Sequence, residues 1–299
     1  MNSLVAFVGV TYVLSVALSV LVGGTGGQAS PLLGIAFVSM AFPAIAVLVV
    51  GAAYGERLDV DWRRIRWTYI PVALLLIPLV MHAVMLPVTA VLEGRLPWQS
   101  WLSRQGDGLF HTAAERDWGV LTGQALAVRI LVNAVIGLIV VSILAIFEEV
   151  GWRAWLLPRL IRLLGNRRAL LATAVIAAVW HLPYAASGIH HLEGVDPAIT
   201  ASVMTVGHVG AGLVIGWMWL RTESMWIVAL AHGALNNWGQ YAFKFMEDFA
   251  TAPDWVVLGA GNAGLLVVGL LLLLFGVPLH RVRSASSEGL PTRVLDLTG

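Results

Sequence analysis

The stretch Ile143–Arg168, ILAIFEEVGWRAWLLPRLIRLLGNRR, contains the transition that decides the fold. A run of apolar residues ends in two adjacent glutamates, Glu148 and Glu149, and an arginine-rich segment follows. An apolar helix of about 20 residues crosses a bilayer, and basic residues collect at its cytoplasmic end. The stretch therefore predicts a membrane-spanning helix that ends at the cytoplasmic face in an acidic pair.

The composition of the whole chain agrees with this interpretation. The chain has 299 residues, of which 59% are hydrophobic and 12% are charged, whereas soluble domains carry about 25% charged residues. The net charge of +1 does not indicate the strongly basic surface that binds nucleic acid. With no cysteine in the chain, disulfides, thiol nucleophiles and cysteine-ligated zinc are excluded. We predict an integral membrane protein.

Apolar segments long enough to span a bilayer recur along the chain, and helices satisfy their backbone groups in lipid. We predict an all-α, polytopic membrane protein, a bundle of eight transmembrane helices that forms a single domain over residues 1–279, with a flexible cytoplasmic tail over residues 280–299. The third segment contains Pro71, Pro78 and Pro87, so we expect a kink or an interruption there. The eight segments are Leu4–Val22, Leu32–Tyr54, Thr68–Leu92, Ala125–Phe147, Ala169–Ser187, Ile199–Leu220, Met225–Phe243 and Trp255–Leu279.

Basic residues are distributed unevenly over the connections between these segments. Strict alternation across eight helices places 13 arginines on the side of the two termini and 4 basic residues on the other side, with Arg129 inside the fourth segment. Because cytoplasmic loops are enriched in arginine and lysine, we predict that both termini are cytoplasmic.

The two glutamates are expected to have different roles. On a helix they point about 100° apart, so they cannot serve one site in the same way. Glu149 and Arg153 have the i, i+4 spacing of a helical ion pair, which leaves Glu148 available for another task. The alternative interpretation is a pair of solvated acids at a helix end.

Further polar residues lie in neighbouring predicted spans, where they are costly and usually face an interior cavity. His181 lies in the fifth segment, and His232 and Asn236 share one face of the seventh because they are spaced i, i+4. We expect these three residues and Glu148 to converge on a cavity that opens to the cytoplasm. Asn237 points elsewhere and is predicted to make an interhelical hydrogen bond.

Such a set of residues can hydrolyse a peptide bond. A carboxylate with a histidine can activate water, and a second histidine with an asparagine amide can stabilise an oxyanion. The same residue types could instead bind a divalent metal such as zinc, and their spacing does not choose between these chemistries. We interpret His82, His208 and Asn133 as interhelical hydrogen bonders.

Other hydrolase signatures are missing or incomplete. The chain contains neither H-E-x-x-H nor G-x-S-x-G. Ser187 in AASG only partly matches a serine-protease motif, because the leading glycine is absent.

The motif EEVGWR, Glu148–Arg153, resembles the E-E-x-x-x-R motif of the CAAX-protease and bacteriocin-processing enzymes, also called Abi proteins or type II CAAX prenyl endopeptidases. His232 and Asn236 match the H-x-x-x-N motif of this family. His181 matches the histidine of F-x-x-x-H, in which Ala177 replaces the phenylalanine, a change of packing. This resemblance covers the centre of the chain.

The resemblance implies an intramembrane endopeptidase of a bacterial or archaeal cell membrane, either glutamate-type or metal-dependent. Glu148 would be the catalytic glutamate and His181 its partner, His232 and Asn236 would stabilise the oxyanion, and Glu149 and Arg153 would support the site. The implied partners are membrane lipid and a peptide or protein substrate, membrane-anchored or lipidated, and no cofactor is required if glutamate activates water. The alternative is a non-enzymatic transporter or scaffold that uses glutamate and histidine as a proton relay.

Overall fold

The computed structural model describes residues 2–94, 103–104, 110–111, 120–189, 195–239 and 254–277. The predicted all-α fold is confirmed, since strands are confined to three antiparallel pieces of two residues each in the described parts of the long loop. The elements are α1 (Asn2–Gly23), η1 (Gly27–Ala29), η2 (Leu33–Ala41), α2 (Phe42–Tyr54), η3 (Trp67–Tyr69), α3 (Ile70–Glu93), β1 (Ser103–Arg104), β2 (Phe110–His111), β3 (Val120–Leu121), α5 (Gly123–Val132), η4 (Asn133–Gly137), α6 (Leu138–Glu149), η5 (Val150–Leu156), α7 (Leu157–Leu164), α8 (Asn166–Trp180), α9 (Leu182–Ala186), α10 (Pro197–Thr222), α11 (Met225–Asn237), α13 (Asp254–Leu271) and η6 (Leu272–Gly276).

Within the described residues, seven helical stretches are long and apolar enough to cross a membrane. They correspond to seven of the eight predicted segments, so the protein is a polytopic helical membrane protein. The remaining predicted segment, Met225–Phe243, is described only as the 13-residue helix α11, and its last residues lie outside the described parts. The predicted tail, residues 280–299, also lies outside them.

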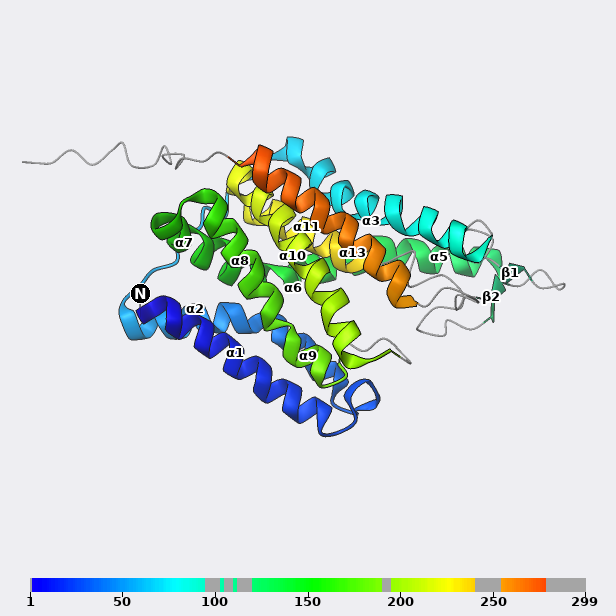
Figure 1. The fold of residues 1–299 in the computed structure, drawn as a ribbon, viewed down its shortest axis with the longest axis horizontal. Helices are drawn as coiled ribbons and strands as arrows, with labels where there is room; N and C mark the ends of the chain where they lie inside the picture. The colour runs from blue at the N-terminus through cyan, green and yellow to red at the C-terminus, as the bar shows by residue number, and fades with distance from the viewer. Residues whose placement is uncertain are drawn as a thin grey trace, which may run out of the picture.

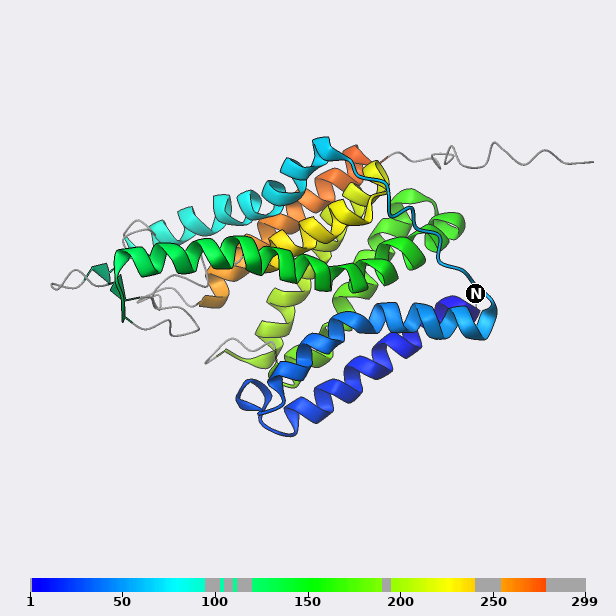
Figure 2. The ribbon, with the colours of Figure 1, turned by 180° about the vertical axis from the view of Figure 1, so that it is seen from behind.

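The helices form two groups on either side of α6. On one side α10, α11, α13 and α3 pack against one another, and on the other side α1 pairs with α2. The view from behind shows the long helical stretch that contains α6 running between these groups (Figure 2). Figure 1 shows α8 and α9 between the α1–α2 pair and α10. Because α6 contacts both α11 and α2, its end is enclosed by helices from distant parts of the sequence.

The end of the fourth predicted segment differs from expectation. Instead of ending at Phe147, the helical stretch continues without a break from Gly123 to Leu164. Residues Val150–Leu156 form a π-helix in which every residue is buried. The two glutamates therefore lie inside the bundle, and the prediction that they emerge at a helix end is wrong because the next turn of the helix is itself packed.

The proline-rich third segment is not interrupted, and no observation tests the kink that was the other expectation. Helix α3 runs uninterrupted for 24 residues, with Pro78 and Pro87 inside it. An internal proline removes a backbone hydrogen bond, and in a membrane span other groups can compensate. The His82 ring donates its Nδ1–H to the carbonyl oxygen of Pro78 over 2.7 Å, which is a different carbonyl from that of Leu74, the one that Pro78 leaves without its N–H partner. His82 therefore bonds within its own helix.

The arginine-rich connection after α2 docks on the turn between α10 and α11. Arg64 forms an ion pair with Glu223, and the Ser224 hydroxyl donates to the carbonyl oxygen of Arg64 over 2.6 Å. The Trp226 indole donates to the carbonyl oxygen of Trp62 over 2.8 Å. Two connections with excess arginine thus meet at one end of the bundle.

The start of the chain and the connection after α6 lie at this same end. Arg159 in α7 pairs with Glu56 just after α2, with 2.9 Å between Nε and Oε2. Hydrogen bonds from the Ser3 side chain and then from Arg159 lower the pKa of the Glu56 carboxyl. The Arg167 guanidinium donates to the carbonyl oxygen of Val277 over 2.8 Å. The arginines that alternation assigned to one side of the membrane are therefore neighbours in space.

This clustering generates a prediction of topology that the absence of cysteine makes easy to test. Single cysteines at Asn2 and Arg63 are expected to be inaccessible to an impermeant thiol reagent in intact cells, because both residues lie at the arginine-rich end. A cysteine at Gln28, beyond the opposite end of α1, is expected to react. Labelling of Asn2→Cys or Arg63→Cys from outside the cell, while Gln28→Cys stays unlabelled, would contradict the predicted orientation.

Candidate active site

Glu148 and Glu149 are the last two residues of α6, immediately before the π-helix η5. The side chains are almost inaccessible, with exposed fractions of 4% for Glu148 and 0% for Glu149. A π-helical turn is rare and often occurs at a functional site. Burial of two adjacent carboxyl groups is costly unless partners compensate for the loss of water.

Arg153 and His232 both bind the same oxygen of Glu149. The distance from Arg153 Nη1 to Glu149 Oε1 is 3.1 Å, and both side chains are buried. The His232 Nδ1 atom lies 2.7 Å from Oε1. The predicted Glu149–Arg153 pair is thus confirmed. The contact with His232, 83 residues further along the chain, was not predicted, since no local spacing indicates it.

The Glu149 carboxylate determines how His232 can act. A carboxylate accepts hydrogen bonds, so Nδ1 of His232 carries the proton in this contact. Nε2 is then the ring atom left to face other groups, as an acceptor in the neutral ring and as a donor in the imidazolium. Glu149 therefore fixes the orientation of the ring as well as pairing with the arginine.

Arg153 also connects α6 to α10. Its Nη2 donates to the carbonyl oxygen of Gly212 over 3.3 Å. A fixed guanidinium fork suits such simultaneous contacts with two acceptors. Since the carboxylate belongs to α6, the imidazole to α11 and the carbonyl to α10, this one network joins three helices.

Glu148 has a different environment, as expected from the angle between the two glutamates. Within the described parts of the chain, its carboxyl group forms none of the hydrogen bonds or salt bridges found for Glu149. It lies within electrostatic range of His232, Glu149 and Arg153. The Trp152 indole approaches it, but Nε1 does not reach hydrogen-bond geometry with any described group. Glu148 is thus a buried carboxyl group that lies near the charged side chains of Glu149 and Arg153 without forming an ion pair with them.

His181 lies at the break between α8 and α9. Its Nδ1–H donates to the carbonyl oxygen of Ala177 over 2.9 Å, which determines the protonated nitrogen in the neutral ring. The ring has a T-shaped contact with Trp180 at 4.6 Å between centroids. Tyr184 lies close to His181, with 6.3 Å between their ring centroids, and within electrostatic range of Glu148.

His208 lies next to the site, although the sequence analysis did not include it among the site residues. Its ring stacks on that of His181, with 3.6 Å between centroids and 18° between the planes. His208 lies on α10 one turn before Gly212, whose carbonyl accepts from Arg153. The i, i+4 spacing of these two residues places both contacts on one face of α10. This role of His208 could not be predicted from the i, i+4 spacing, because Gly212 takes part through its backbone carbonyl and has no side chain to indicate it.

Helix α11 carries His232 and, one turn later, the half-buried Asn236, as predicted. The end of this helix is fixed by η4, a second π-helical turn before α6. The Asn237 side chain donates to the carbonyl oxygen of Asn133 over 2.8 Å, and the Trp238 indole donates to that of Ala134 over 3.0 Å. The predicted interhelical hydrogen bond of Asn237 is confirmed.

Close helix packing adds to this anchoring. At Gly233, beside His232, an added Cβ would lie 2.0 Å from the Ser142 hydroxyl oxygen of α6. Only glycine allows this approach. The distance between α11 and α6, and hence between His232 and Glu149, depends on the absence of a side chain there.

Other candidates from the sequence lie elsewhere. The Ser187 hydroxyl, just after α9, donates to the carbonyl oxygen of Tyr184 over 3.2 Å, and Ser187 faces α1. No group of three or more histidine, aspartate or glutamate side chains among the described residues is arranged to hold a metal ion. The residues as placed thus do not offer the usual ligand set of a catalytic zinc site.

These observations define a helical membrane protein with a buried carboxylate–histidine–arginine network. The family described as type II CAAX prenyl endopeptidase Rce1-like matches residues 129–238 of the chain. This region contains Glu148, Arg153, His181, His232 and Asn236, so the resemblance drawn from the motifs is confirmed over these residues. No curated protein matches the chain significantly.

Burial of the Glu149–Arg153 pair leads to a prediction of stability. Arg153→Ala leaves a carboxylate with 0% exposure without its cation, which is expected to cost about 3–5 kcal/mol. Arg159→Ala is the matched control, because it breaks an arginine–glutamate pair whose side chains are 16% and 27% exposed and is expected to cost about 0–1 kcal/mol. Equilibrium unfolding in detergent measures both. Equal losses of stability for the two variants would contradict the buried network.

Proposed function

We propose that the protein is an intramembrane endopeptidase in which Glu148 activates water for attack on a peptide bond. The observation that carries this proposal is the contrast between the two buried acids. Glu149 is bound by Arg153 and His232, whereas Glu148 beside it forms no ion pair among the described residues and is approached by the Trp152 indole. A general base must be close to its substrate and free to take a proton.

In the proposed reaction, Glu148 takes a proton from a water molecule while the water oxygen attacks the carbonyl carbon of the scissile bond. The carbonyl oxygen becomes an oxyanion in the tetrahedral intermediate. Glu148 then passes the proton to the leaving nitrogen as the carbon–nitrogen bond breaks. The products are a carboxylic acid and an amine, which ionise to a carboxylate and an ammonium group, and no redox partner is needed.

His181, His232 and Asn236 have separate tasks in this proposal. The Nε2 atom of His181 accepts from the attacking water, because Nδ1–H is engaged with Ala177. The Asn236 amide donates to the oxyanion, together with Nε2–H of His232 in its imidazolium form. Fixed donors of this kind stabilise developing charge without reorganisation.

Charge balance supports the cationic form of His232 in this arrangement. Glu149 and Arg153 neutralise each other in their buried pair. An imidazolium at His232 would in the same way neutralise the Glu148 carboxylate, and unpaired charge is costly at such depth. Once Glu148 has taken the proton from water, it is neutral, and the positive charge of the His232 imidazolium lies where the oxyanion forms.

The proposed substrate is a peptide or protein whose scissile bond lies within or close to the membrane, such as a membrane-anchored or lipidated segment. Burial of both glutamates inside the helical bundle supports this choice. The site is proposed to open toward the cytoplasm, the side to which the arginine-rich end is assigned. Endopeptidase activity is favoured over the transporter or scaffold alternative, because the family that matches this region is described as an endopeptidase.

The experiment is cleavage of a peptide library by the purified protein in detergent. Glu148→Gln keeps the shape of the side chain and removes the base, so turnover is expected to fall by about 10²–10⁴-fold while the protein stays folded. Glu56→Gln, which alters a glutamate near the surface, is the control and should retain turnover. Full turnover of Glu148→Gln would contradict the role of Glu148, and loss of wild-type turnover on adding a chelator would show that a divalent metal takes part.

The stacked imidazoles provide a second test of the arrangement. His208→Ala removes the ring against which His181 packs, and a displaced catalytic group can cost up to about 10²-fold, so we expect turnover to fall tenfold or more with little change of KM. His208→Phe retains a flat ring and should restore most of the turnover. Equal impairment of both variants, with unchanged unfolding, would show that the imidazole itself is required and that stacking is not its role.

A further inference from the structure

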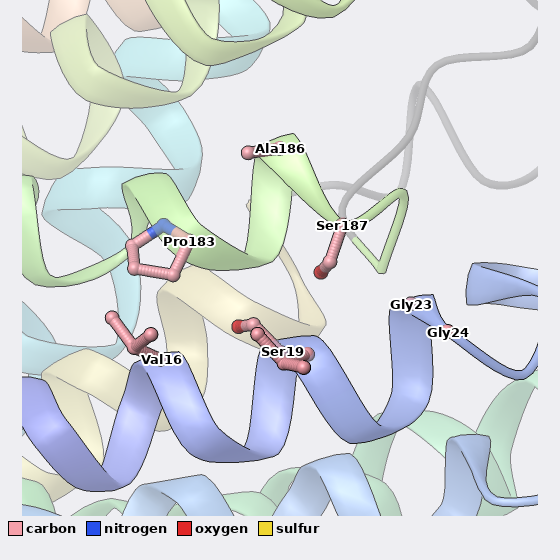
Figure 3. Close-up of a pocket in the computed structure, with 8 residues that line it drawn as sticks. Val16, Ser19, Gly23, Gly24, Pro183, Ala186 and Ser187 are labelled. Carbon is pink, nitrogen blue, oxygen red and sulfur yellow. The ribbon is translucent and has the colours of Figure 1, made fainter.

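A groove with a volume of about 530 Å³ lies between α1 and α9, and none of its lining residues belongs to the carboxylate–histidine network. This volume is within the range of about 300–1,000 Å³ found for small-molecule sites. Figure 3 shows the Ser19 side chain on α1 facing the side chains of Pro183, on α9, and of Ser187, just after α9. The lining residues are Val16, Ser19, Val20, Gly23, Gly24, Pro183, Ala186 and Ser187.

The two helices meet at both ends of this groove and are apart between them. At one end the hydroxyl groups of Ser15 and Tyr184 are hydrogen-bonded at 2.6 Å. At the other end an added Cβ on Gly23 would lie 2.8 Å from the Cβ of Ser187. The opening along α1 is therefore about 12 Å long at 1.5 Å per residue. A transmembrane helix, about 10–12 Å across with its side chains, would cover this opening, whereas an alkyl chain can enter it.

A buried hydroxyl group without a partner faces this opening. Ser19 is 3% exposed, and its Oγ has no hydrogen-bond partner among the described residues. A serine or threonine in a helix can satisfy itself on the carbonyl four residues earlier, as Thr11 does on Phe7 over 2.8 Å. Because an unsatisfied buried hydroxyl is costly, a ligand in the groove should carry a hydrogen-bond acceptor.

The groove has an apolar, exposed edge and lies at the depth where a membrane lipid could bind. Its outer edge is formed by Val16 and Val20, which are 48% and 70% exposed. Ser19 lies one turn before the end of α1 at Gly23, or about 6 Å along the axis. Helix α1 has 22 residues and so spans a hydrocarbon core of about 30 Å. The hydroxyl is thus placed near the core boundary, where ester groups join acyl chains to the polar headgroup.

We propose that the groove between α1 and α9 is a binding site for one acyl chain of a glycerophospholipid, with its ester carbonyl accepting a hydrogen bond from Ser19. The apolar edge holds the chain, and the hydroxyl selects a chain that carries a carbonyl at this depth. Binding closes the gap between helices that touch only at its two ends. This site lies outside the proposed peptidase machinery and does not depend on that function.

The test uses the full-length protein in liposomes with a phospholipid probe that carries a photoreactive diazirine near the start of one acyl chain. Two probes are compared, one with ester-linked chains and one with ether-linked chains, and crosslinked peptides are mapped by mass spectrometry. The ester probe is expected to label the segments around Ser19 and Ala186 roughly two- to tenfold more than the ether probe, the factor given by one hydrogen bond. In Ser19→Ala the two probes should label these segments equally.

Filling the groove provides the second measurement. Ala186→Leu enlarges an exposed residue at its edge and should lower labelling by both probes, whereas Ala52→Leu, at an exposed alanine of α2, should not. The proposal would be overturned by labelling at the groove equal to that of the exposed face around Val13 and unaffected by Ala186→Leu, because the lipid there would be annular only. Equal labelling by ester and ether probes in the unmodified protein would overturn the role of Ser19.

Discussion

The buried carboxylate of Glu149 is the constraint on which the arrangement of the central helices depends. A charge with no access to water must be compensated within the protein, and here Arg153 and His232 provide the compensation. Because His232 is on α11 and Arg153 also reaches α10, the network requires α6, α10 and α11 to pack together. The neighbouring Glu148 lies beside this network and, in the described parts of the chain, forms no ion pair with it.

Much of the fold could be predicted from the sequence because apolar length and arginine placement are local signals. The spans found in the structure coincide with the predicted segments to within a few residues over most of the chain. The Glu149–Arg153 pair was predictable as well, because both residues are on one helical stretch. Asn237 could be assigned to helix packing from its angle relative to Asn236.

Contacts between distant segments could not be predicted in the same way. The bond from His232 to Glu149 and the stack of His208 on His181 depend on how whole helices approach. The burial of the glutamates inside the bundle was not predicted, because the apolar run of side chains stops at Phe147. The tryptophans beyond the glutamates continue the buried stretch, with Trp152 and Trp155 packed around Phe7 of α1.

The π-helical segment Val150–Leu156 has a consequence for how this region can change in evolution. A π-helix contains one more residue between bonded partners than an α-helix, so deletion of a single residue could return the segment to α-helical geometry. A deletion between Glu149 and Arg153 would also change their i, i+4 spacing, and because successive helical positions differ by about 100° it would turn Arg153 away from Glu149. Sequence length in this segment is therefore constrained as strictly as sequence identity, and variation should occur there by substitution, without insertion or deletion.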